Sequence, residues 1–572
     1  SLALKIYRPL KAGHKSGFVI VSGNANQKLA ARKKSPSTKR QHSQKLINFL
    51  KSPASYPHRP RRVLSMQTHI SWVFIASPFV FKVKKPVNLG FLDFSTLGKR
   101  HHFCQRELEL NGRLCPDVYL DVLPIYKTPS DFSFKAKGKI AEFCLKMKEL
   151  PKGGFLGELV AERRVGEGEI DRIISRLRHF YESQTPNRDI EQWGTPEKLK
   201  ISTDENFTQV EPFVGRKISP AAFEAIRHFT NEFYVRNEKL FCRRIQQHWI
   251  RDCHGDVHLD HIHLTPEATT IFDCIEFNDR FRFIDVANDV AFLAMDFDFE
   301  GRSDLGNLLL RNCAREFHDP EMLKLSDFYK CYRALVRAKV ETIQATSMKR
   351  MKAREHSDAA ARYFRLALRY AVSGSEPLLL AVIGRVGTGK STVARELGNE
   401  LNWPVFSSDQ IRKTLAGVPL TRRTPARKRA EVYSRQMTGQ TYKELLARGL
   451  LAAETHGGAI VDATFSSAAN RESFRQKCEK AHVRFQAVEL EVEPGEIEHR
   501  LRARNKSIGV ISDARLEDLE KLLAAYEAPS QLSPNLITVP ADTAIANTVK
   551  SVLLRLTELQ LRRFQAEPNL IS

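Results

Sequence analysis

The feature that most constrains this 572-residue chain is the segment at residues 378–392, LLLAVIGRVGTGKST. A short apolar run, typical of a buried parallel strand, ends at Gly384, and Gly389, Lys390 and Ser391 then complete the pattern G-x-x-x-x-G-K-S. The residues that follow have apolar side chains at helical spacing. A strand, a glycine-rich turn and a helix in this order predict a phosphate-binding loop of a nucleotide-binding protein.

Each position of the predicted loop has an expected task. Glycines let the backbone approach a phosphate closely, and the helix N-terminus offers unpaired amides to an anion. We expect Lys390 to reach the β and γ phosphates of ATP and Ser391 to ligate Mg²⁺. The predicted nucleotide-binding residues are Gly384, Arg385, Val386, Gly387, Thr388, Gly389, Lys390, Ser391 and Thr392.

Two later strands end in carboxylates. VFSSD ends at Asp409 and is followed by Arg412, and IVD ends at Asp462. Ligands of doubly wound sheets bind at the carboxyl ends of the strands, so both carboxylates are expected to face the phosphates. We predict that Asp462 binds Mg²⁺ and that Asp409 receives the proton of an acceptor hydroxyl. The alternative for each is a helix cap that follows a strand.

The segment EHRLRAR contains Arg500 and Arg504, four residues apart on one predicted helix face. Such cations could close over a transferring phosphate, or they could form an ordinary solvated basic face. Together with GRVGTGKST, SSDQIRK and IVDATF, this segment resembles the P-loop kinases with a hydroxyl acceptor, of the polynucleotide-kinase-like, gluconate-kinase-like and zeta-toxin-like group. The resemblance covers about residues 375–560 and implies catalytic roles for Lys390, Asp409, Arg412, Arg500 and Arg504.

A second constellation lies upstream, in CHGDVHLDHIHL and TIFDCIEFND. In kinase chemistry, an Asp in H-x-D takes the acceptor proton, and a second Asp beyond a strand binds Mg²⁺. Asp256 and Asp273 have this spacing. Lys82, on a predicted strand, and Glu107, on a predicted helix, could form the lysine–glutamate pair that binds nucleotide phosphates.

These segments, with THISWVF and FKVKKPVNLGFLDFSTLGKR, resemble the aminoglycoside-phosphotransferase-like kinases. More closely, the chain resembles bacterial two-domain proteins that fuse such a domain to a P-loop domain, over about residues 41–560. The resemblance implies two nucleotide-dependent phosphotransfer modules. It also expects a metal-binding Asn at the position of His261. Since Mg²⁺ prefers oxygen ligands, we expect this domain to be either a weakened kinase or a binding module.

The same resemblance implies that His254, Asp285 and Asp289 stabilise the loop that carries Asp256. We expect His258 to be a surface or core residue.

The predicted fold class is multidomain α/β and α+β. It begins with a basic, disordered extension over residues 1–40. A bilobal protein-kinase-like domain follows over 41–372, with a small lobe at about 60–150 and a helical large lobe at about 151–372. After an SGSEP linker at 373–377, residues 373–572 alternate strands and helices, which predicts the parallel α/β sheet of a P-loop NTPase.

The charge distribution and the composition limit the classes of partner and the compartment that we expect for this chain. Residues 1–92 hold 18 of the 90 basic residues and none of the 66 acidic residues, so the remainder carries only +6 of the net charge of +24. The basic leader could target the chain, bind nucleic acid or be a bland extension. No apolar run approaches bilayer length, and nine scattered cysteines fit a reducing compartment, so we expect a cytoplasmic protein without membrane partners.

Three functions compete at this point. The first is an ATP- and Mg²⁺-dependent kinase that acts on the hydroxyl of a small molecule. The second is a nucleic-acid 5′-hydroxyl kinase, which the modest charge outside the leader does not favour. The third is an ATP-gated regulatory protein with a degenerate kinase-like N-terminal domain, which the His261 substitution motivates.

Overall fold

The computed structural model describes residues 36–90, 92–135, 138–348, 350–420, 422–505, 513, 516–541 and 544–565. Contacts divide the chain into two compact units, one with residues up to 195 and 244–322, the other with residues 196–243 and 323–572. Residues 1–35 of the predicted extension lie outside the described part, and a helix begins at Pro36. The helices of residues 196–243 and 323–372 belong to the second unit, and the domain boundary near residue 373 stays a prediction.

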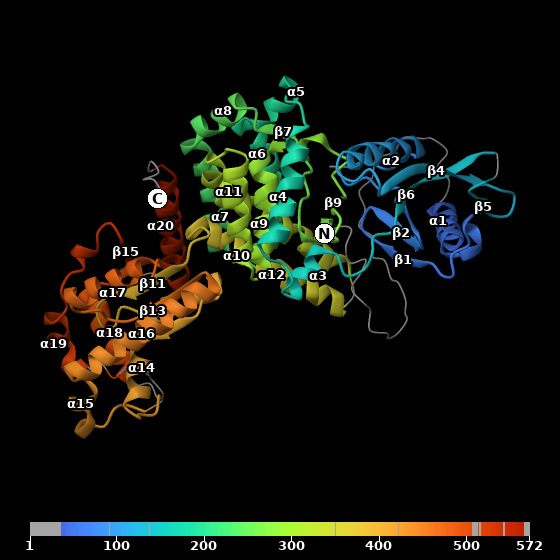
Figure 1. Cartoon of the computed structure of the whole chain (residues 1–572). Helices are drawn as coiled ribbons and strands as arrows, with labels where there is room; N and C mark the ends of the chain where they lie inside the picture. The colour runs from blue at the N-terminus through green and yellow to red at the C-terminus, as the bar shows by residue number, and fades with distance from the viewer. Residues whose placement is uncertain are drawn as a thin grey trace, which may run out of the picture. The chain divides into compact units, whose positions relative to one another are not determined.

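The first unit contains an antiparallel sheet with the strand order β1-β2-β3-β6-β4-β5 (Figure 1). Alternation along β3 places Phe81 and Val83 in an apolar cluster with Leu50 of α1, so they cover one face of the sheet. Lys82 and Lys84 therefore lie on the opposite face, where both contact α2. This arrangement carries two lysines into the interior of the unit.

The sheet and its covering helices are followed by short strand pairs and a helical region. The strands of the first unit are β1 (Leu64–Gln67), β2 (Ser71–Ala76), β3 (Phe79–Lys84), β4 (Tyr119–Lys127), β5 (Phe132–Ser133), β6 (Ile140–Lys148), β7 (Ile250–Asp252), β8 (Ile262–Leu264), β9 (Thr269–Ile271) and β10 (Phe283–Asp285). The helices are α1 (Pro36–Lys51), α2 (Leu97–Gly112), α3 (Leu156–Ala161), α4 (Glu167–Glu182), α5 (Arg188–Glu191), α9 (Val286–Phe299) and α10 (Ser303–Glu316).

The second unit is built on a parallel sheet with the order β12-β13-β11-β14-β15. Helices α16 and α17 cover one face through an apolar cluster that includes Leu379, Leu445 and Phe474. Helix α13 contacts β11 and β13 and packs against α12 and α20. The strand order reverses beside β11, which is where doubly wound sheets bind ligands.

The strands of this unit are β11 (Leu378–Ile383), β12 (Val405–Ser407), β13 (Gly458–Asp462), β14 (Arg484–Glu491) and β15 (Leu536–Pro540). Its helices are α6 (Pro196–Val210), α7 (Pro220–Arg236), α8 (Glu238–Gln246, which ends in the first unit), α11 (Glu321–Ser347), α12 (Arg350–Val372), α13 (Lys390–Leu401), α14 (Ser408–Leu415), α15 (Ala426–Val432), α16 (Arg435–His456), α17 (Ala468–Lys480), α18 (Pro494–Asn505), α19 (Leu519–Ala524) and α20 (Ile545–Gln565).

The sequence pattern and the structure agree on the elements that matter for the sites. The strands predicted at residues 378–383, 405–409 and 460–462, and in the segments RFQAVELEV and NLITVPA, form the parallel sheet, although β12 ends at Ser407 rather than at Asp409. The predicted helical stretch at residues 327–370 is two helices, α11 and α12. Within the described residues, no helix has both the length and the apolar character that a membrane span requires.

Candidate functional site

The phosphate-binding loop connects the buried strand β11 to the N-terminus of α13. Its tight course uses left-handed backbone at Gly387 (φ 87°) and Gly389 (φ 92°). A Cβ atom on Gly387 would lie 3.0 Å from Ile497 Cγ2 of α18, so a side chain there would meet both backbone strain and a close neighbour. The loop therefore holds the amides at the start of α13 toward an anion.

Lys390, Ser391 and Asp462 meet at the carboxyl end of the sheet. The Ser391 hydroxyl donates to Asp462 Oδ2 at 2.6 Å, and Lys390 Nζ donates to the Arg385 carbonyl oxygen at 2.7 Å. Asp462 is the last residue of β13 and pairs in register with Val382 of β11. The predicted convergence of the loop serine and the strand carboxylate is therefore present in the structure, and the lysine folds back over its own loop.

Asp462 lies in a place that disfavours its charge. Its side chain is buried, and burial raises the pKa of this carboxyl, while Lys390 and a hydrogen bond from Ser391 oppose the rise. The negative charge of Asp409 raises the Asp462 pKa further, so the two predicted carboxylates act on each other. The side chain of Ser407, the last residue of β12, also lowers the pKa of Asp462. Ser407 is not among the residues predicted from the sequence, although its place at a strand end was a signal for it.

The donor set of this site fits Mg²⁺. A serine hydroxyl and a carboxylate are the oxygen ligands that this cation prefers, and nucleotide phosphates supply further oxygens. A cation also explains why a carboxylate is kept in a buried position where its charge is otherwise unfavourable. Ser391 and Asp462 would hold the ion.

The predicted arginines have different surroundings. Arg412 is buried; its Nη1 donates to the Val432 carbonyl oxygen at 3.2 Å and to Thr438 Oγ1 at 3.0 Å. Arg500 lies against the loop, because its Nη1 donates to the Thr388 carbonyl oxygen at 3.4 Å. Arg504 is in the last turn of α18, and its side chain lies outside the described residues. The structure thus brings Arg500 to the loop, while the guanidinium of Arg412 is held by α15 and α16.

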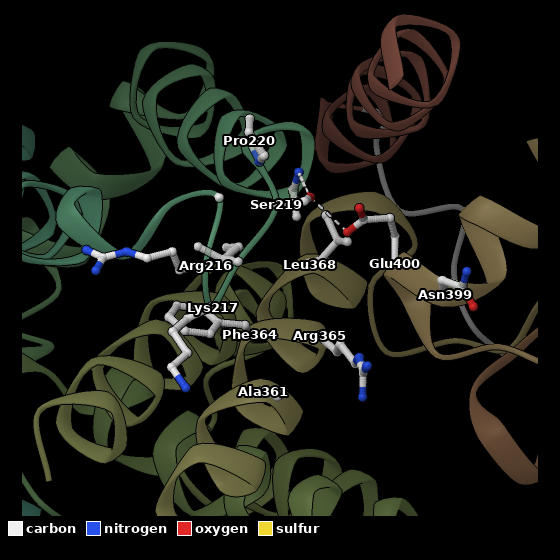
Figure 2. A pocket seen from close by; sticks show the side chains of 13 residues that line it. Arg216, Lys217, Ser219, Pro220, Ala361, Phe364, Arg365, Leu368, Asn399 and Glu400 are labelled. Atoms are coloured by element: carbon white, nitrogen blue, oxygen red, sulfur yellow. Dashed lines mark hydrogen bonds between the residues drawn. The ribbon is translucent and has the colours of Figure 1, made fainter. Parts of the chain in front are cut away.

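A cavity of about 380 Å³ lies at the other end of α13 (Figure 2). Arg216, Lys217 and Arg365 contribute cationic side chains, and Ser219 Oγ donates to Glu400 Oε2 at 2.9 Å. Asn399 lines this cavity nine residues after Lys390, which corresponds to about 14 Å along a helix. A molecule in this cavity is therefore too far away to accept phosphate at the loop.

The first unit brings together the second predicted constellation. Lys82 Nζ lies 2.7 Å from Glu107 Oε1 and 2.7 Å from Asp273 Oδ1. Although burial lowers the pKa of Lys82, the adjacent charges of Asp273 and Glu107 raise it well above its ordinary value. The predicted lysine–glutamate pair is formed, and it is extended by the predicted metal-binding aspartate. Lys82 is thus held as a cation.

A second lysine shares this network. Lys84 Nζ lies 2.6 Å from Glu107 Oε2 and also contacts Glu276. Burial raises the pKa of Glu276, against the pull of Lys84. Neither Lys84 nor Glu276 is among the residues predicted from the sequence. A signal for Lys84 was present, because period-two alternation places it on the same strand face as Lys82.

Replacement of Glu107 by glutamine is expected to destabilise the first unit by about 3 kcal/mol, because it removes the charge that two buried lysines share. Glu109 on the same helix is the matched control, since its partner Arg106 is 3.4 Å away and its side chain is 68% exposed. Glu109→Gln should change the free energy of unfolding by less than about 0.5 kcal/mol. Urea unfolding of both variants measures this, and equal effects would contradict a shared buried carboxylate.

The loop around Asp256 is held by a tight turn at Gly255 and by the Asp289 side chain of α9. Gly255 has φ 83°, and a Cβ atom there would lie 2.5 Å from the Phe281 carbonyl oxygen, so glycine is required. Asp289 accepts hydrogen bonds from the amides of His254 and Gly255, at 2.8 and 2.9 Å. Asp285 forms a buried pair with Arg244. These contacts agree with the expected stabilising role of Asp289, whereas Asp285 holds Arg244 and the start of α9 and not the loop itself.

His254 does not act as a charged group in this loop. Its Nε2 donates to the Phe272 carbonyl oxygen at 2.9 Å, and its Nδ1 accepts from the Asp256 amide at 3.2 Å. Burial lowers the pKa of His254 to about 4, so the ring is neutral. This tautomer fixes the course of the chain before Asp256.

His261 does lie beside the two predicted catalytic and metal-binding carboxylates. Its Nε2 is 3.4 Å from Asp273 Oδ2, and its Nδ1 is 3.4 Å from Asp256 Oδ2. His258, which we expected to be a surface or core residue, is fully buried in this group, with its Nε2 3.6 Å from Asp256 Oδ2. The spacing D-x-H-x-x-H was a signal for it. Two imidazoles beside the carboxylates do not fit Mg²⁺, which prefers oxygen.

Comparison with known proteins gives one family model and several relatives. The model of an AAA domain matches residues 379–529, which confirms the predicted P-loop domain in this part of the chain. The chain is 32% identical over 416 residues to the uncharacterized protein Rv2004c of Mycobacterium tuberculosis (strain H37Rv), covering 73% of this chain and 81% of that protein. The uncharacterized protein Mb2027c of Mycobacterium bovis matches with the same values.

Solved structures match a third of the chain. A gluconokinase from Sinorhizobium meliloti 1021 has 18% identity and a TM-score of 0.26, and the match covers 33% of this chain and 98% of that one. A shikimate kinase from Aquifex aeolicus has 18% identity and a TM-score of 0.22, and covers 31% of this chain and 96% of that one. The aminoglycoside-phosphotransferase-like identity of the N-terminal part stays a prediction.

Proposed function

The chain belongs to the same family as the mycobacterial proteins Rv2004c and Mb2027c, and from its C-terminal site we propose that it is a kinase. It would transfer the γ-phosphate of ATP, with Mg²⁺, to a hydroxyl group of a small molecule. The observation that carries the proposal is the 2.6 Å hydrogen bond between Ser391 and Asp462 beside a glycine-rich loop. The residues that would bind the phosphates and those that would ligate the metal thus lie at the same edge of the sheet.

Each residue of the site has a chemical task in this proposal. Lys390 exchanges its bond to the Arg385 carbonyl oxygen for the phosphates and neutralises charge on them. Asp409, in the first turn of α14, orients the acceptor hydroxyl and receives its proton. Arg500 stands beside the loop as a further cation. When bound, Mg²⁺ supplies additional positive charge on the phosphate oxygens.

A nucleic-acid 5′-hydroxyl kinase is the second candidate, and one surface of the described residues favours it. The segment that precedes α16, together with the first residue of α16, is rich in cations with exposed or half-exposed side chains, namely Arg422, Arg423, Arg427, Lys428, Arg429 and Arg435. Asp513, which contacts Thr424, Tyr433 and Lys413, holds this basic segment in place. Such a surface suits an acceptor that carries phosphate groups.

For the first unit, we propose a kinase-like nucleotide site whose catalytic competence is reduced. Its support is the Lys82–Glu107 pair beside Asp273, on a sheet covered by α2. If the first unit transfers phosphate, Asp256 would be its proton acceptor. The alternative is that the first unit is a degenerate kinase domain that binds nucleotide as a regulatory sensor. If His261→Asn greatly raises phosphate transfer in a Lys390→Ala background, the natural first unit is a degraded kinase.

The experiment that tests the kinase proposal is transfer of γ-labelled phosphate from ATP to a metabolite pool by the full chain. The expected result is a labelled small molecule in the wild-type reaction that is absent with Lys390→Ala. A parallel reaction offers DNA and RNA with free 5′-hydroxyls at increasing salt. Label on the nucleic acid alone, lost steeply with salt, would favour the second candidate. Label on neither pool would contradict both kinase proposals.

A further inference from the structure

The two histidines beside Asp256 each use one ring nitrogen, Nδ1, in a hydrogen bond of the loop, and their Nε2 atoms are left for another role. His258 and His261 are fully buried, and their ring centroids lie 3.8 Å apart. One ligand atom of each histidine and one carboxylate oxygen of Asp256 lie within 4.8 Å of one another. Within the described residues, the Nε2 atoms of both rings are buried and have no hydrogen-bond partner. Buried polar atoms without partners are rare and call for an explanation.

The hydrogen bonds of His261 define where its lone pair lies. Its Nδ1 is 2.9 Å from the Asp256 backbone oxygen, and since a carbonyl only accepts, Nδ1 carries the proton. The Nε2 atom then presents a lone pair to Asp273 Oδ2, 3.4 Å away. Two hydrogen-bond acceptors face each other in the interior, which is unfavourable unless a positive charge lies between them.

Two of the distances between these atoms match the spacing of ligands around a tetrahedral cation. Ligands at about 2.05 Å from a tetrahedral ion are about 3.4 Å from one another. His261 Nε2 and Asp273 Oδ2 are 3.4 Å apart, and His258 Nε2 and Asp256 Oδ2 are 3.6 Å apart. Imidazole nitrogen is a good ligand for d-block divalent ions and a poor one for Mg²⁺.

We propose that Asp256, His258, His261 and Asp273 form a binding site for one d-block divalent cation, with Zn²⁺ as the probe. Binding at His258 Nε2 moves the ring proton to Nδ1, which gives up its bond from the Asp260 amide and faces Asp296 Oδ2 at 4.0 Å. A carboxylate beyond the ligated ring is a common support of metal-binding histidines. The proposal is independent of the kinase activity of the second unit.

The consequence concerns Asp256 and Asp273. Carboxylates that hold a d-block cation are not free to act as proton acceptor and Mg²⁺ ligand. The first unit then uses the acidic positions of a kinase-like site for metal retention, with Lys82 neutralising the second oxygen of Asp273 at 2.7 Å.

The test uses the full chain, stripped with a chelator and dialysed separately against Zn²⁺, Co²⁺ and Mg²⁺. We expect about one equivalent of Zn²⁺ by elemental analysis, no retained Mg²⁺, and visible Co²⁺ absorption typical of tetrahedral nitrogen ligation. His261→Asn should weaken Zn²⁺ binding at least about 10-fold. His102→Ala, with an exposed ring on α2, is the matched control and should bind as the wild type does.

Two further variants keep the outcome decisive. Cys242→Ser removes an exposed thiol that could bind Zn²⁺ adventitiously. This variant should still bind about one equivalent of Zn²⁺ per chain. His258→Asn should also weaken binding, and circular dichroism of each variant reports whether it folds. Zn²⁺ content that is negligible in the wild type, or equal in wild type, His261→Asn and His258→Asn, would overturn the proposal.

Discussion

Replacement of Lys390 by alanine is expected to lower phosphate transfer by the C-terminal module by about 100- to 1000-fold. In the structure the ammonium group lies 2.7 Å from the Arg385 carbonyl oxygen, above the loop formed around Gly387 and Gly389. No other lysine occurs between residues 353 and 412, so no lysine of β11, the loop or α13 can replace it at the phosphates. Steady-state transfer of γ-labelled phosphate measures the loss.

Arg395 provides the matched control for this change. It lies on the same helix, α13, and its exposed side chain contacts Glu396 Oε1 at 3.4 Å. Arg395→Ala removes a cation from α13 without touching the loop, and transfer should stay within about twofold of the wild type. An equal loss in both variants would mean that general charge on α13, and not the grip of Lys390, supports the activity.

Asp409→Asn is expected to reduce transfer to the hydroxyl acceptor by about 100-fold or more, because a positioned base contributes at least this much. The carboxylate lies in the first turn of α14, directly after β12, and its charge acts on Asp462. Since Asp409 is proposed to act on the acceptor, the apparent KM for ATP should change little while kcat falls. Kinetics with ATP and acceptor varied separately measure this difference.

Glu431→Gln is the control for Asp409, because it removes an exposed carboxylate from nearby α15. Its kinetics should match those of the wild type. Full hydroxyl transfer by Asp409→Asn, combined with its loss in Lys390→Ala, would reject Asp409 as the base and leave the nucleotide site intact. A rise in KM for ATP would instead assign Asp409 to nucleotide or metal binding.

The elements of the second unit could be predicted because their signals are local. The strand at residues 378–383 is buried at every position, and the loop glycines have the conformations that the motif requires. Period-two and helical patterns likewise predicted β2, β3 and α2 in the first unit. Whether these segments form strands, helices or a tight loop follows from backbone chemistry and apolar periodicity within a few residues.

The remaining features depend on contacts between distant segments. The SGSEP segment has a linker's composition, yet Lys330 Nζ of α11 donates to Ser375 Oγ at 3.0 Å, and the adjoining helices join the second unit. Arg412 follows the kinase pattern in sequence, yet α16 holds its guanidinium through Thr438. The position of His258 beside His261 depends on the turn between them. No local pattern contains such tertiary information.

Calorimetric titration of the full chain with a non-hydrolysable ATP analogue and Mg²⁺ tests most directly whether residues 384–392 bind a nucleotide. We expect saturable binding to the wild type and the loss of one binding equivalent in Lys390→Ala, with binding to Arg395→Ala unchanged. A second, weaker equivalent that survives in Lys390→Ala would belong to the site of Lys82. Identical isotherms for the wild type and Lys390→Ala, or no heat for either, would contradict a nucleotide site at residues 384–392.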